Sequence, residues 1–82
     1  MTQPFKELTH GRRTYDMDEA VYLASRYSLV DRTQAYYVVC VRGEWGDEWD
    51  AATQNELDTC FPGHLPHAAY FRGREVWHKE VF

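Results

Sequence analysis

A run of β-branched and aromatic residues near the middle of the chain constrains the fold most. Tyr36-Tyr37-Val38-Val39-Cys40-Val41 is rich in residues that favour strands and poor in residues that favour helices. Both alternating faces of this run are largely apolar, as in strands that lie inside a sheet. We therefore predict a central strand over Thr33–Arg42, covered on at least one face by a helix.

The covering helix is predicted to follow Asp16. Asp16 and Glu19 have the N-cap and N3 spacing of a capping box. Apolar residues then recur at three- and four-residue spacing and form one face of a helix. They are Met17, Ala20, Leu23 or Ala24, and Tyr27. We predict a helix over about Met17–Leu29 (17–29) whose apolar face belongs to the core.

The remaining segments predict further short elements. Gly43 and Gly46 mark a reversal into a return strand over residues 48–52. Thr53 and Glu56 form a second capping-box pattern, which opens a short helix over about 54–60. Three further segments are expected. They are a first strand or arm over residues 4–10, a loop over His10–Thr14, and a hairpin of residues 68–71 and 75–82 around Arg72-Gly73-Arg74.

These elements predict one α+β domain over residues 1–82. Its antiparallel sheet has three to five strands, packed by one main α-helix and a short second helix. The chain has 82 residues, which is too few for two independent cores. Its aromatic content of 16% makes a single core feasible. A homodimer would enlarge that core.

Composition also suggests where the protein works. No secretory signal or membrane-spanning stretch is visible in the sequence. Cys40 and Cys60 are too few for a disulfide scaffold, so we expect both to be reduced and buried. The net charge of −4 argues against direct binding to nucleic acid. We expect a soluble cytoplasmic protein with no cofactor.

The sequence gives only weak support for metal binding and for catalysis. Cys60, His64 and His67 occur within eight residues and would supply three ligands to zinc, but the second half of a typical zinc module is missing. The alternative interpretation is a buried Cys60 at a helix end and two loop histidines. No nucleophile elbow or phosphate-binding loop is present. The sequence thus favours a protein that is not an enzyme, with metal binding as a weak alternative.

Acidity is concentrated in one segment, Glu44–Asp58. This segment carries −6, whereas residues 1–43 and residues 59–82 carry +1 each. Its first part also holds two tryptophans, Trp45 and Trp49. One interpretation is a solvated surface that keeps an aromatic-rich protein soluble. The other is a partner-binding surface that seeks a basic patch, with tryptophan as its anchor. The candidate residues are Glu44, Trp45, Asp47, Glu48, Trp49 and Asp50.

The chain is a small α+β domain that is acidic, rich in aromatic residues and without a catalytic motif. In this general character it resembles the small inhibitor proteins of phages and mobile elements, in particular anti-CRISPR proteins. The acidic run Glu44-Trp45-Gly46-Asp47-Glu48-Trp49-Asp50 carries the resemblance. The resemblance implies binding to the basic, nucleic-acid-handling surface of a CRISPR effector complex and obstruction of its target DNA. The other function considered is a small interaction or regulatory module that assembles with itself or another protein through exposed aromatic residues, such as Trp45, Trp49 or Trp77.

Overall fold

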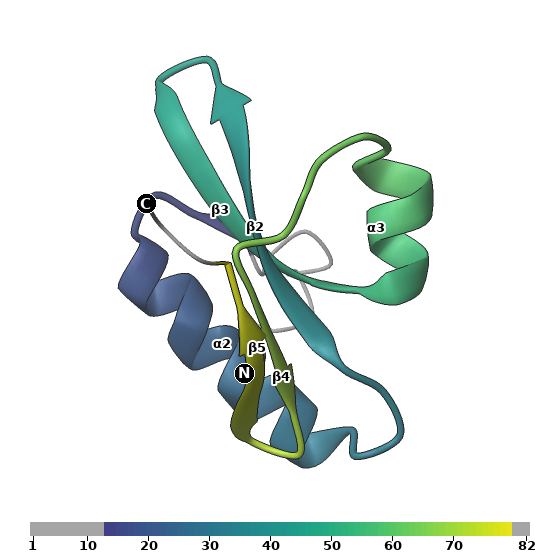
Figure 1. Cartoon of the computed structure of the whole chain (residues 1–82). Helices are drawn as coiled ribbons and strands as arrows, with labels where there is room; N and C mark the ends of the chain where they lie inside the picture. Colours follow the sequence, from purple (N-terminus) through teal and green to yellow (C-terminus); the bar gives the residue numbers. More distant parts are fainter. Residues whose placement is uncertain (1–12, 80–82) are drawn as a thin grey trace, which may run out of the picture.

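Residues 13–79 form an α+β fold, with one five-stranded antiparallel sheet and two helices (Figure 1). A computed structural model describes residues 13–79 of the chain. The strands are β1 (Arg13–Thr14), β2 (Tyr36–Gly43), β3 (Gly46–Thr53), β4 (Ala68–Phe71) and β5 (Arg74–His78). They lie in the order β1-β3-β2-β4-β5, so the predicted central strand β2 is indeed central. The helices are α2 (Met17–Val30) and α3 (Gln54–Cys60).

Helix α2 packs on one face of the sheet through small residues. Ala20 and Ala24 are fully buried against Val38 of β2 and Ala51 of β3. Because alanine keeps the backbones close, the helix can lie directly on the strands. Asp16 caps the helix by accepting a hydrogen bond of 3.1 Å from the backbone N–H of Asp18. The predicted cap residue is confirmed. The predicted core face is confirmed except at Met17, which begins the helix and is 44% exposed.

The predicted capping box does not form at this helix, because the Asp16 side chain accepts from the N–H of Asp18 and not from that of Glu19. Glu19 accepts a hydrogen bond of 2.7 Å from the Thr14 hydroxyl, while the backbone N–H of Asp16 donates to the same hydroxyl over 3.3 Å. Thr14 is within reach because it belongs to β1, where the sequence predicted a loop. β1 pairs with β3 over only two residues, which is too short to leave a periodic signal.

Helix α3 covers the opposite face of the sheet (Figure 1). Leu57 and Phe61 are buried there against Val39 of β2 and Ala52 of β3. Both bonds of the predicted capping box form: Thr53 accepts from the N–H of Glu56 over 3.2 Å, and Glu56 accepts from the N–H of Thr53 over 2.9 Å. The apolar character of both faces of β2 therefore follows from helices on both sides of the sheet.

The hairpin of β4 and β5 closes the other end of the sheet. Its turn residues Arg72 and Gly73 have φ angles of 55° and 83°, the left-handed values that a tight two-residue turn requires. The predicted hairpin is confirmed, with its second strand ending at His78. The predicted arm over residues 4–10 and the end of the predicted last strand lie outside the described residues.

Candidate functional site

The β2–β3 hairpin extends beyond the rest of the sheet (Figure 1). The two strands pair from Tyr36 with Thr53 to Gly43 with Gly46, which leaves Glu44 and Trp45 as the only loop residues. A Cβ atom at residue 43 would overlap the Glu48 side chain, which would have to move aside. Gly46 has a φ of +129°, a backbone conformation that residues with a Cβ rarely adopt. The predicted chain reversal is present, and β2 and β3 together form a narrow two-stranded arm that ends in it.

The tip of this arm is the most exposed part of the acidic segment. Trp45 is 80% exposed, and Glu44 and Asp47 on either side of it are exposed as well. The Asp47 carboxylate lies 3.5 Å from Nε of Arg42, in an ion pair whose two side chains are both open to solvent. Such a pair is weak, so a partner can displace it at little cost. We call Glu44, Trp45 and Asp47 the hairpin tip.

Glu48 and Asp50 lie on the α3 side of the arm, because side chains alternate along β3. The Arg13 guanidinium serves both: Nη1 lies 3.4 Å from Glu48 and Nε lies 3.4 Å from Asp50. Asp50 is only 6% exposed. Its carboxylate is therefore a buried, paired charge that belongs to the fold. This corrects the predicted surface, from which Asp50 is removed and in which Glu48 is half-buried.

Trp49 lies on the other side of the arm and faces helix α2. It packs against the cluster that contains Ala20 and Val38, and its ring meets the His67 ring edge-on at 4.9 Å between centroids. This agrees with the predicted position inward or at the rim. Trp49 is half-buried, so Trp45 is the tryptophan that a partner can reach fully.

The weak zinc alternative finds no support among residues 13–79, where no three His, Cys, Asp or Glu side chains are grouped as metal ligands. His67 meets Trp49 edge-on at the α2 face, whereas His64 meets Phe61 edge-on at the α3 face. Burial and the nearby Lys79 charge lower the pKa of His67. Cys60 is exposed, contrary to the prediction that it is buried, because the short helix turns it away from the sheet.

Cys40 is the other thiol that was predicted to be buried, and it is only partly buried. Cys40 of β2 is half-buried opposite Trp49. Burial raises the pKa of the Cys40 thiol, and the Asp47 carboxylate raises it further. A thiol in these surroundings stays protonated and is a poor nucleophile. This agrees with its interpretation as a small apolar residue of the sheet.

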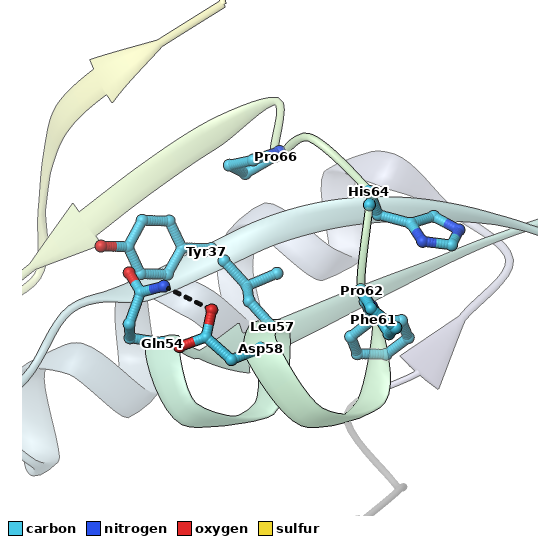
Figure 2. Close-up of a pocket in the computed structure, with 9 residues that line it drawn as sticks. Tyr37, Gln54, Leu57, Asp58, Phe61, Pro62, His64 and Pro66 are labelled. Carbon is cyan, nitrogen blue, oxygen red and sulfur yellow. Dashed lines mark hydrogen bonds between the residues drawn. The ribbon is translucent and has the colours of Figure 1, made fainter.

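A hollow of about 460 Å³ lies between α3 and the following loop (Figure 2). Tyr37, Leu57 and Phe61 form its apolar part. Its polar edge holds Asp58, whose carboxylate accepts a hydrogen bond of 3.2 Å from the Gln54 amide. The hollow is open to solvent and offers an apolar surface with a single carboxylate.

A second hollow was not predicted from the sequence. It has a volume of about 430 Å³ and is lined by Tyr37, Leu65, Pro66, Trp77 and Lys79, which we call the aromatic groove. It shares Tyr37 and Pro66 with the hollow beside α3. The alternation of β5 around Trp77 was the available signal, but only the strand order places Trp77 near Tyr37.

Among residues 13–79, no helix is long and apolar enough to cross a membrane. Comparison with protein-family models, curated proteins and solved structures finds no match to this chain.

Proposed function

We propose that this chain is a non-enzymatic inhibitor that binds a basic surface of a nucleic-acid-handling complex through its hairpin tip. The observation that carries the proposal is Trp45, which is 80% exposed at the end of a projecting arm, between two exposed acids. Tryptophan is enriched among the residues that dominate the binding energy of protein interfaces. The tip therefore has the form of an anchor.

Charge at the tip defines the kind of partner. Glu44 and Asp47 flank the anchor, and the weakly paired Arg42 is the nearby basic residue of β2. Arg13 and Asp50 form an ion pair, so their opposite charges together contribute little to the outside potential. Acidic groups around an apolar anchor speed association with a basic patch and disfavour acidic partners. A partner with Lys or Arg around an apolar pocket fits this tip.

Nucleic-acid-handling complexes present such patches because they bind phosphates. A protein seated on the patch competes directly with DNA or RNA for the same cations. This mode of inhibition agrees with the resemblance to anti-CRISPR proteins, so we propose a CRISPR effector complex as the partner. The protein itself would contact only the effector's basic surface, without contacting nucleic acid.

The test measures target binding by purified, guide-loaded CRISPR effectors of several types, with a fluorescent DNA duplex. The wild-type chain should abolish duplex binding by one type. Trp45→Ala and Glu44→Lys should each weaken inhibition by about tenfold or more, since each removes a central contact. Higher salt should weaken inhibition by the wild type as well.

Matched variants control for general effects on the protein. Tyr22→Ala removes an aromatic ring that is 58% exposed on α2, and Asp58→Lys makes the same charge change as Glu44→Lys on α3. Both should inhibit like the wild type. Full inhibition by Trp45→Ala and Glu44→Lys would overturn the role of the tip. A folded wild-type chain that inhibits none of the effectors would overturn the proposed partner.

A further inference from the structure

The aromatic groove is built by a row of three residues across neighbouring strands. Tyr37 of β2 pairs with Ala69 of β4, and Ala69 pairs with Trp77 of β5. Directly paired residues point to the same face of a sheet. The small, buried Ala69 therefore lies between the two aromatic residues in the strand register, and Tyr37 and Trp77 line the groove on this face. Among residues 13–79, helix α3 packs on β2 and β3 on this face and not on β5.

The groove remains open at its rim. Leu65 is 77% exposed and Trp77 is 47% exposed, although both are large apolar side chains. Lys79 lines the same hollow and brings a positive charge to its edge. Among the described residues, β5 is the outer strand of the sheet at this end. An occupant should therefore offer an apolar side chain with an acidic neighbour.

We propose that the aromatic groove of one copy binds the hairpin tip of a second copy. Trp45 is the most exposed large apolar side chain among residues 13–79, and its neighbour Glu44 carries a negative charge that is complementary to Lys79. A hollow of about 430 Å³ has room for an indole ring. A protruding apolar residue and a complementary pocket on the same molecule make a heterologous contact between copies.

This contact would regulate the proposed function, and in that respect the inference rests on it. A Trp45 ring held in the groove of another copy is hidden from an effector complex. Self-association at high protein concentration then keeps the hairpin tip covered, and dilution exposes it. The self-association itself requires no partner and can be measured with the purified chain alone.

The first experiment is analytical ultracentrifugation of the full chain from about 10 µM to about 1 mM, the range in which weak contacts populate complexes. The wild type should associate. Trp45→Ala and Leu65→Glu should each raise the dissociation constant by about tenfold or more. Val30→Glu is the matched control for Leu65→Glu, because Val30 is also 77% exposed but lies at the end of α2. It should associate like the wild type.

Mixing the two defective variants tests whether the hairpin tip of one copy binds the aromatic groove of another. Trp45→Ala keeps an intact groove, and Leu65→Glu keeps an intact tip. The mixture should associate again through the one remaining contact, although neither variant does so alone. The charges offer a parallel test: Glu44→Lys and Lys79→Glu should each weaken association, and the double variant should recover it. Circular dichroism confirms that each variant is folded.

Three outcomes would overturn this inference. They are a wild type that stays monomeric throughout the range, a Trp45→Ala variant that associates like the wild type, and a mixture that fails to recover association. The third would point to a symmetric contact that pairs the same residues on both copies. The Leu65→Glu variant separates this inference from the proposed function, since its intact tip should still inhibit the effector.

Discussion

The hydroxyl of Ser28 accepts a hydrogen bond of 2.9 Å from the backbone N–H of Gly73. Ser28 is fully buried in α2, and Gly73 is the second turn residue of the β4–β5 hairpin. Ser25, one turn earlier, donates to the Gly73 carbonyl over 3.3 Å. Helix α2 thus binds both the N–H and the C=O of one turn residue, Gly73. This clamp fixes the hairpin that supplies Trp77 to the aromatic groove.

Ser28→Ala should lower the free energy of unfolding by about 1–3 kcal/mol, because the Gly73 N–H would be left without its acceptor. Ser25→Ala should cost less, since its bond to Gly73 is longer and Ser25 is only half-buried. Urea unfolding monitored by circular dichroism measures both values. A larger loss for Ser25→Ala than for Ser28→Ala would contradict the assignment of the main contact.

Arg72→Asn should stabilise the protein. Arg72 is the one described non-glycine residue with a positive φ, at 55°, where a side chain like that of arginine is strained. Asn-Gly is the favoured sequence for this turn, and the gain should be about 1 kcal/mol. It would be reduced by loss of the exposed bond from Arg72 to the Arg32 carbonyl.

The matched change in the same turn is Gly73→Ala, which should destabilise the protein. Gly73 has a φ of +83°, and a new Cβ would lie 3.2 Å from a methyl carbon of Leu29. Thermal unfolding of the two variants should shift the midpoint in opposite directions. A lower midpoint for Arg72→Asn would show that the contacts of Arg72 outweigh its strain.

Arg13→Ala should lower the free energy of unfolding by about 1–2 kcal/mol, because it removes a cation that pairs with the buried Asp50 carboxylate. The estimate is below that for a fully buried pair, since the Arg13 side chain is 41% exposed. Arg42→Ala removes an ion pair with Asp47 that is open to solvent and should cost less than about 0.5 kcal/mol. Equal losses in urea unfolding would contradict this division.

The elements predicted from the sequence are those whose signals are local. The β-rich run of β2, the Thr53 and Glu56 capping box, and the glycine turn of the last hairpin each lie within a few neighbouring residues. All three are present in the structure. β1 was missed because two residues carry no period, and its pairing depends on β3 being in place.

The candidate site was predicted only in part, since its residues depend on distant partners. Asp50 looks like a surface acid in the sequence, but Arg13, 37 positions earlier, pairs with it at the sheet edge. The aromatic groove likewise depends on strand order, which brings Tyr37 and Trp77 to either side of Ala69. The position of Trp45 in a turn was predictable from local sequence, because Gly43 and Gly46 mark the reversal on either side of it.

Acid should weaken the fold through Asp31 at the end of α2. Hydrogen bonds from the Thr33 hydroxyl, the Gln34 amide and the Thr33 N–H, with a further one from Tyr36, lower the pKa of Asp31 from 3.8 to about 2. The unfolded chain therefore binds a proton more readily, and the stabilising contribution is complete above about pH 4. It is lost as the pH falls towards 2, and Asp31→Asn should remove this pH dependence. Urea unfolding between about pH 2 and pH 5 measures the slope, and a folded-state NMR titration of Asp31 with a midpoint of 3.8 would contradict the explanation.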